Sequence, residues 1–225
     1  MRMKLGSGKA ICVLGATAAT LAAAPVAASA EPGVAVAVWT VRGHGASASA
    51  GVNVLTVNDQ KRIDNRIGAY TGADGRLVLT APEGLGDPDG SGANCALDNA
   101  KPNEPSATEV SCAAGYIGAI VGHLAGGSDT FDADPGLDVM VGAVVNGVPR
   151  PLSGGPGRDR LIGGAVGDLL YGRSGPDVLI GGGANDVLVG AGGRDKLIGG
   201  AGKDTCRGAG GTDTGKNCEL VRSIP

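Results

Sequence analysis

Residues 154–216 divide into seven consecutive units of nine residues, and this segment decides the fold. In order, the units are GGPGRDRLI (154–162), GGAVGDLLY (163–171), GRSGPDVLI (172–180), GGGANDVLV (181–189), GAGGRDKLI (190–198), GGAGKDTCR (199–207) and GAGGTDTGK (208–216). Glycine opens every unit. The sixth position is always aspartate: Asp159, Asp168, Asp177, Asp186, Asp195, Asp204 and Asp213. The eighth position holds Leu161, Leu170, Leu179, Leu188 and Leu197, and then Cys206.

One unit predicts a glycine-rich turn followed by a short strand. Glycine lets the chain turn through positive φ angles, and the three residues after it carry one apolar side chain that can point inward. Two units would complete one coil of a parallel stack, with leucines between two thin sheets. A single unit cannot bury its leucine, so the stack depends on neighbouring coils. The predicted fold class is all-β, with a parallel β-roll, a nonapeptide solenoid, preceded by a β-rich N-terminal region.

The stacked aspartates predict a metal site. Aspartates two units apart would lie roughly 5 Å from each other, where like charges repel by about 3 kcal/mol at an effective dielectric constant of about 20. We therefore expect the metal-free stack to be disfavoured and a hard divalent cation to bind between its turns. Carboxylate and carbonyl oxygens suit calcium, whereas magnesium prefers a tighter octahedron and keeps its waters. Alternate units form two columns, which predict three sites on one edge and two on the other.

The units resemble the G-G-x-G-x-D-x-U-x nonapeptides of RTX (hemolysin-type) calcium-binding proteins. The resemblance covers residues 154–213 and implies a calcium-bound parallel β-roll that is disordered without the ion. It also implies that the seven aspartates are the metal ligands. Several units depart from the pattern, so we expect unequal sites: Arg173, Ala191 and Ala209 replace the second glycine, and Val166 and Ala184 replace the fourth. A metal-free β-helix or a disordered tail is the alternative, but neither requires an aspartate at every ninth residue.

The first thirty residues read as a secretory signal. Arg2, Lys4 and Lys9 precede the apolar stretch Ala10–Ala24, and Ala28-Ser29-Ala30 is a small-x-small cleavage site. Cleavage would leave a chain that starts at Glu31 and is secreted. With this signal and its Ala/Gly-rich composition, the chain resembles the small exported calcium-binding proteins of high-GC Gram-positive bacteria. The segment from Asp204 to Glu219 resembles the end of those proteins.

Charge and hydropathy limit the possible partners. The formal charge is -3 for the whole chain, and removing Arg2, Lys4 and Lys9 makes the mature chain more acidic. No basic patch with interleaved aromatics is present, so we expect no nucleic-acid partner. No second long apolar run follows the signal, so we expect no membrane span. An unknown extracellular protein or surface partner stays open. Inside the repeats, basic residues such as Arg158, Arg160, Arg194 and Lys196 are expected on solvated faces.

Four cysteines follow the signal: Cys95, Cys112, Cys206 and Cys218. An even number in an exported protein favours disulfides, with three possible connectivities. Their spacings of 17 and 12 residues suggest two local bridges, Cys95–Cys112 and Cys206–Cys218. Neither pair has the C-x-x-C spacing typical of a thiolate metal site.

The chain is expected to divide into five parts. The signal (1–30) precedes a β-rich region (31–125), a degenerate lead-in to the roll (126–153), the roll (154–215) and a C-terminal cap (216–225). The lead-in is predicted from Gly126–Thr130 and from Asp138–Gly142.

Within the β-rich region, alternating valines at 34–38 and a second run at 52–57 predict strands. Asp74-Gly75 predicts a hairpin, and Ala81–Ser106 is predicted as a long loop. In this loop Asp87, Asp89, Ser91, Gly92 and Asp98 match part of an EF-hand pattern. No flanking helices are expected, so a polar surface loop is the default.

Catalytic motifs are missing. The chain has two histidines, His44 and His123, and contains neither H-E-x-x-H nor G-x-S-x-G. The 43 glycines and five aromatic residues also argue against a helix-rich enzyme. We therefore predict a secreted, non-enzymatic protein whose β-roll folds on binding several calcium ions. The alternatives are an extracellular adhesion or matrix protein that uses the roll as a spacer, and a hydrolase with an unrecognised site in residues 31–125.

Overall fold

A computed structural model describes most of the chain after the expected signal. The described residues are 34–41, 52–59, 64–86, 95–98, 106–145 and 148–222, and they form strands and no helix. The predicted all-β class is therefore confirmed. The predicted signal peptide (1–30) and residues 87–94 of the EF-hand-like loop lie outside the described residues. The described part of the chain contains no helix that could span a membrane.

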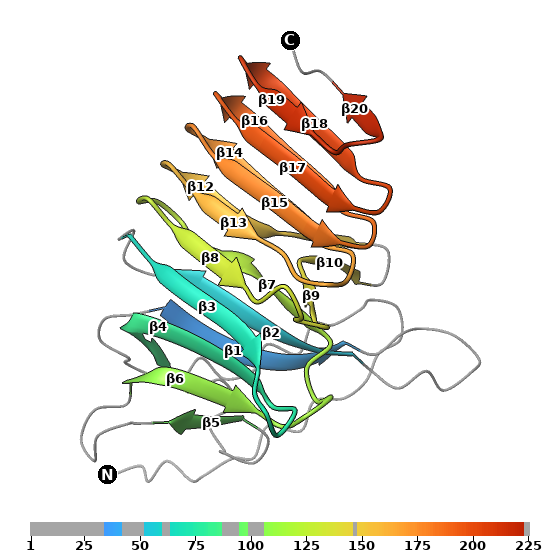
Figure 1. Ribbon diagram of the computed structural model, residues 1–225. Coiled ribbons are helices and arrows are strands. Elements are labelled where there is room, and N and C mark those ends of the chain that lie inside the picture. The colour runs from blue at the N-terminus through green and yellow to red at the C-terminus, as the bar shows by residue number, and fades with distance from the viewer. Residues whose placement is uncertain are drawn as a thin grey trace, which may run out of the picture.

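Two parallel sheets, here called sheet A and sheet B, run side by side along the molecule (Figure 1). Sheet A contains, in spatial order, β2 (Val52–Asp59), β7 (Ala119–His123), β12 (Leu152–Pro156), β14 (Leu169–Ser174), β16 (Val187–Gly193), β18 (Thr205–Gly211) and β20 (Leu220–Arg222). Sheet B contains β3 (Arg66–Thr71), β8 (Thr130–Ala133), β13 (Arg160–Ile162), β15 (Val178–Gly183), β17 (Lys196–Ala201) and β19 (Thr214–Lys216). From β12 onward the chain alternates between the two sheets, so each pair of units completes one coil.

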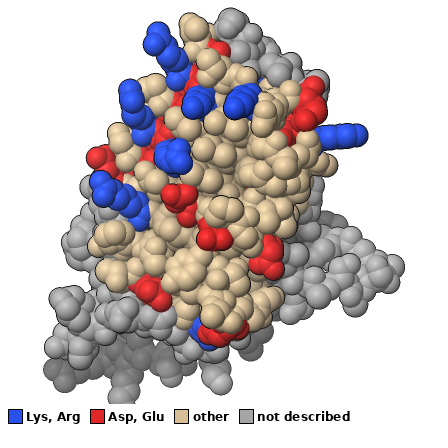
Figure 2. Space-filling view, viewed as in Figure 1, with Lys and Arg blue, Asp and Glu red and all other residues tan. Residues whose placement is uncertain are grey.

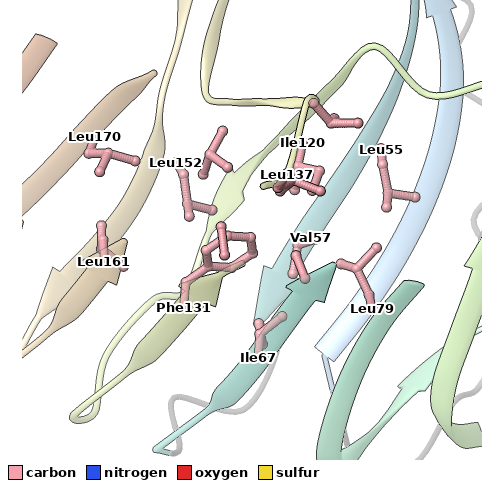
Figure 3. Packing of buried hydrophobic residues seen from close by; sticks show 14 of the residues in the cluster. Leu55, Val57, Ile67, Leu79, Ile120, Phe131, Leu137, Leu152, Leu161 and Leu170 are labelled. Atoms are coloured by element: carbon pink, nitrogen blue, oxygen red, sulfur yellow. The ribbon is translucent and has the colours of Figure 1, made fainter. Parts of the chain in front are cut away.

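The eighth residues of the first six units fill the space between the sheets. In sheet A, Leu152, Leu170, Leu188 and Cys206 are paired in register and fully buried. In sheet B the corresponding column continues from Phe131 through Leu161 and Leu179 to Leu197. Figure 3 shows Leu152, Leu161 and Leu170 in one cluster with Phe131. The leucine spacing therefore predicted the core of the roll.

Antiparallel strands close the N-terminal end of both sheets. β1 (Val34–Val41) pairs with β2 in sheet A, and β4 (Leu77–Gly86) pairs with β3 in sheet B. A single parallel pair, Val34 with Leu85, joins β1 to β4. β4 also pairs with β6 (Ser106–Cys112), which pairs with β5 (Cys95–Asp98). This end of the molecule therefore differs from the roll in strand direction.

The predicted hairpin at Asp74-Gly75 is confirmed, because β3 and β4 are antiparallel neighbours joined by this turn. The predicted loop Ala81–Ser106 is partly wrong. β4 continues through Ala81 to Gly86, and β5 lies in the middle of the range. The strand continues past Pro82 because its register with β6 shifts between Thr80 and Leu85. Such a shift accommodates a proline, which cannot donate a sheet hydrogen bond.

The coils begin before the repeats. β2 pairs in parallel with β7, and β3 pairs in parallel with β8. In turn, β7 pairs with β12 and β8 pairs with β13. Between β8 and β12 the chain forms β9 (Met140–Val141), which pairs with β7, and a separate hairpin of β10 (Ala143–Val145) and β11 (Val148–Arg150). β2 and β3 therefore have the same parallel arrangement as the strands of the roll.

Candidate metal centre

The aspartates at the sixth position all lie in turns at the two edges of the stack. Edge 1 contains the turns that leave sheet A and enter sheet B, with Asp159, Asp177, Asp195 and Asp213. Edge 2 contains the turns that leave sheet B and enter sheet A, with Asp168, Asp186 and Asp204. Each of the seven is at most 5 % exposed. Carboxylates are rarely so buried unless they are paired or hold a metal.

Hydrogen bonds connect the aspartates of edge 1 into a column. The backbone N–H of Asp159 donates to Oδ1 of Asp177 at 2.9 Å, and the same bond recurs from Asp177 to Asp195 and from Asp195 to Asp213. The carbonyls of Asp159, Asp177 and Asp195 each accept the N–H of the seventh residue in the next coil at 2.8 Å. The repeat places every carboxylate against the backbone of its neighbouring coil.

Edge 2 contains a second column of the same kind. The N–H of Asp168 donates to Oδ1 of Asp186 at 2.8 Å, and that of Asp186 donates to Oδ1 of Asp204 at 2.9 Å. The column ends at Glu219, whose side chain accepts the N–H of Asp204. Glu219 also donates its own N–H to the carbonyl of Asp204. Glu219 therefore takes the place of an aspartate in the last coil.

The second carboxylate oxygens have no protein partner. Oδ2 is buried without a hydrogen bond in Asp159, Asp177, Asp186, Asp195, Asp204 and Asp213. Asp168 differs, because its Oδ2 accepts the N–H of Gly164 at 2.7 Å and its Oδ1 accepts that of Val141. A buried polar atom without a partner costs about 1–3 kcal/mol, and more when it is charged. Six carboxylates therefore present an unsatisfied oxygen inside the turns.

The glycine that opens each unit makes room for this carboxylate. A Cβ at Gly154 would lie 2.2 Å from Oδ2 of Asp159, and a Cβ at Gly181 would lie 2.0 Å from Oδ2 of Asp186. The same clash recurs in every unit. The first glycine is thus required by the aspartate five residues later rather than by its backbone angles.

Turns of successive coils also approach each other through their carbonyls. The fourth residues of the edge 1 turns, Gly157, Gly175, Gly193 and Gly211, have φ between 119° and 150°. A Cβ at Gly175 would lie 1.7 Å from the carbonyl oxygen of Gly157. At the second position of the same edge, Arg173, Ala191 and Ala209 have φ of 88°, 80° and 79°. Positive φ strains a residue with a Cβ, so the substitutions noted in the sequence fall at constrained positions.

Burial raises the pKa of several of these carboxyl groups. Desolvation raises the pKa of Asp159 to about 6 and that of Asp177 and Asp186 to about 7, and repulsion from stacked aspartates adds to the effect. Backbone hydrogen bonds oppose the rise without cancelling it. The pKa of Asp168 also rises to about 7 through desolvation. In the metal-free roll the pKa values of Asp168, Asp177 and Asp186 therefore lie close to neutral pH.

The structure brings all seven predicted aspartates into the two columns, and it adds residues that the periodicity of nine did not indicate. Asp129 donates its N–H to Oδ1 of Asp159, and Asn65 donates to Asp129 in turn. Gly127-Ser128-Asp129 has the local pattern of a repeat turn, which could have indicated Asp129. Asp138, in the second predicted lead-in motif, is exposed, and Val141 contributes only its N–H to edge 2.

Both suggested cysteine pairs form disulfides in the structure. Cys95–Cys112 joins β5 to β6, which are neighbours in the antiparallel part of the molecule. Cys206–Cys218 joins the leucine column to the segment just before Glu219. The second bridge therefore holds the last residue of the edge 2 column near Asp204.

Basic side chains lie outside the columns. Residues 154–216 contain eight lysines and arginines, all exposed: Arg158, Arg160, Arg173, Arg194, Lys196, Lys203, Arg207 and Lys216. Figure 2 shows Lys and Arg side chains projecting from the part of the molecule that the repeats form. The expectation that they lie on solvated faces is confirmed. The acidic groups of the repeats are buried, so the repeats have their carboxyl groups in the interior and their basic groups at the surface.

The donor set fits calcium. Within the repeat turns the unpartnered atoms are carboxylate oxygens, and the carbonyls of stacked turns approach one another closely. Both carboxylate and carbonyl oxygens are ligands that calcium prefers. In the described residues, no group of three or more His, Cys, Asp or Glu side chains could hold a metal ion. A cation in the turns would therefore need backbone carbonyls as well as carboxylates.

Comparison with known proteins agrees with this geometry. Residues 153–188, 162–197 and 180–214 match the family model of the RTX calcium-binding nonapeptide repeat, a model that spans four copies of the unit. Residues 153–214 therefore carry RTX calcium-binding repeats, folded as a parallel β-roll. No curated protein and no solved structure matched the chain. The resemblance to exported proteins of high-GC Gram-positive bacteria thus stays a prediction.

Proposed function

We propose that this protein is secreted and that its roll folds when several calcium ions bind between the stacked turns. The RTX repeats make it a calcium-binding repeat protein; export and folding on calcium are the proposed parts. The proposed ligands are the seven repeat aspartates together with turn carbonyls. Asp168 is expected to contribute least, because both of its carboxylate oxygens already accept backbone N–H groups.

The unpartnered Oδ2 atoms of six buried aspartates carry this proposal. Without a cation, the folded roll keeps these oxygens away from water and stacks carboxylates above one another. A divalent ion would supply both the missing partner and the opposite charge. Because the unfolded chain lacks this arrangement, the binding free energy of the ions becomes folding free energy. The roll therefore depends on the calcium concentration around it.

Export is supported by the signal pattern of residues 1–30 and by two disulfides, which persist in oxidising compartments. Extracellular modules commonly bind calcium at about 10⁻⁴ to 10⁻³ M, so the proposed location would supply enough calcium. We also propose a non-enzymatic role, since the sequence lacks the protease and lipase motifs.

Circular dichroism of the full chain in chelator and in millimolar calcium tests the proposal. We expect a gain of β-sheet signal on adding calcium, and heat of calcium binding in calorimetry. Asp186→Asn, which changes a buried column residue, should require several-fold more calcium. Asp138→Asn, at an exposed position outside both columns, is the matched control and should behave like wild type. An unchanged spectrum without calcium heat would contradict the proposed function.

A further inference from the structure

The turn before the repeats, residues 124–132, follows the repeat turn 154–162 position by position. Gly127 bridges to Gly157, and Thr130 and Phe131 pair with Arg160 and Leu161. The separation is 30 residues instead of the 18 between stacked repeats, because the segment containing β9, β10 and β11 lies between them. This turn lies outside the matched residues 153–214, and its sequence period does not reveal it.

Asp129 occupies the sixth position of this turn and makes the contacts of a repeat aspartate. Its N–H donates to Oδ1 of Asp159 at 2.9 Å, the distance found from Asp159 to Asp177. Its carbonyl accepts the N–H of Arg160 at 2.8 Å. Asp129 is 1 % exposed, and its Oδ2 is buried without a hydrogen-bond partner. The side chain thus has the same unsatisfied oxygen as the repeats.

The carbonyls of this turn also match those of the repeats. A Cβ at Gly155 would lie 1.6 Å from the carbonyl oxygen of Ala125, and one at Gly157 would lie 1.5 Å from that of Gly127. Ala125 has φ of 64°, as expected for the constrained second position. The two turns therefore provide a carboxylate and stacked carbonyls in the arrangement that the calcium-binding repeats use.

Asn65 ends the column one coil earlier. Its backbone N–H and its Nδ2 both donate to Oδ1 of Asp129 at 2.9 Å, and Asn65 is fully buried. The amide holds the carboxylate in position without adding a negative charge.

We propose that the cation column of edge 1 starts at Asp129, with a calcium ion between turns 125–129 and 155–159 and with Asn65 as the neutral end of the column. This inference rests on the proposed calcium binding and adds a site outside the nonapeptide repeats. Leu124 stands at the first position, where every repeat has glycine. The Asp129 carboxylate cannot lie as close to that residue, so we expect weaker binding here than between the repeats.

The site would couple calcium to the N-terminal coils. Asp129 directly precedes β8, and β8 pairs with β3 as well as β13. An ion at this position therefore stabilises the junction between the repeats and the strands before them.

Native mass spectrometry of the full chain in saturating calcium tests the proposal by counting bound ions. Asp129→Asn keeps the size of the side chain and removes its charge, so we expect one calcium ion fewer per chain than wild type. Asp132→Asn is the control, since Asp132 is exposed in the same strand, and should leave the number unchanged. An unchanged number in Asp129→Asn would overturn the proposal. Wild type without bound calcium would instead overturn the proposed function.

If Asp129→Asn does not fold, a crystal structure of the wild-type chain grown in calcium decides. The expected result is an ion about 2.3–2.6 Å from Asp129 Oδ2, the usual calcium–oxygen distance. Ions between the repeats with none at Asp129 would refute the additional site while leaving the proposed function intact.

Discussion

Contacts with single atoms limit which residues each position of a turn can accept. The first glycine of a unit lies against its aspartate, and the fourth glycine lies against the carbonyl of the preceding coil. The two glycines are required for different reasons, one by a side chain and the other by both φ and a backbone atom. The third position is less constrained, because a Cβ at Gly192 or Gly210 would meet no atom closer than 3.4 Å. Adjacent positions of one turn should therefore respond differently to substitution.

Gly193 and Gly192 test this difference. Gly193 has φ of 145°, and a Cβ there would lie 2.1 Å from the carbonyl oxygen of Gly175. Gly193→Ala should therefore lower the free energy of unfolding in calcium by about 2–4 kcal/mol. At Gly192 the nearest atom would be 3.6 Å away, so Gly192→Ala should change it by less than about 1 kcal/mol. Denaturant unfolding measures both, and equal losses would contradict the stacking of these turns.

At the scale of elements, the last coil differs from the others. Gly215 stands where sheet B has leucine, so β19 contributes no apolar side chain to the core. The Cys206–Cys218 disulfide and the Glu219 contact with Asp204 close this end instead. A covalent link and a polar contact therefore replace part of the missing core.

Cys218→Ala tests this closure, because it removes the bridge and leaves Cys206 buried in the leucine column. Closing a loop of this size is worth about 3 kcal/mol, so the free energy of unfolding should fall by roughly 2–3 kcal/mol. We also expect faster hydrogen exchange in β18 and β20, measured by mass spectrometry in calcium. Breaking the other bridge with Cys95→Ala should leave exchange in β18 and β20 unchanged. Equal protection of β18 and β20 in wild type and Cys218→Ala would show that the bridge does not hold this end.

The whole roll has its acidic groups inside and its basic groups outside. The seven repeat aspartates are buried, whereas the eight lysines and arginines of residues 154–216 are exposed. Protons and the proposed calcium ions would therefore compete for the same interior carboxylates. Because several carboxylates share this environment, their protonation should affect the stability of the roll as a unit.

Metal-free stability should therefore fall as pH rises. Folding raises the pKa of Asp159 to about 6 and that of Asp168, Asp177 and Asp186 to about 7, from an ordinary value of 3.8. The metal-free folded roll binds more protons than the unfolded chain, so this stabilisation is present at acidic pH and is lost as pH rises through 6 to 7. Calcium binds the ionised form, so its affinity should instead increase over the same range.

Thermal unfolding of the full chain at several pH values, after removal of calcium on a chelating resin and again in millimolar calcium, measures both trends. Opposite slopes of stability against pH in the two series are expected. A metal-free roll that becomes more stable from pH 5 to 7.5 would contradict the raised pKa values.

Local periodicity was enough to predict the roll. The glycine, aspartate and leucine positions repeat every nine residues, and each coil contacts mainly its neighbours, so the sequence spacing carries over directly into strand register. The seven aspartates, the leucine column and both disulfide pairs could therefore be predicted without tertiary information. The strands within residues 81–106 were harder to predict from the sequence, because β5 and the end of β4 depend on pairing with β6 rather than on their own sequence.

Tertiary structure decided which residues complete the two ends of the columns. Asn65 and Asp129 are 64 residues apart and join edge 1 only because β3 and β8 lie side by side. Glu219 joins edge 2 across 15 residues, beside a disulfide and out of the repeat period. A regular repeat specifies contacts between neighbouring units through sequence distance, but its ends meet chain segments with no fixed spacing. Which residues complete them therefore depends on how the rest of the chain packs.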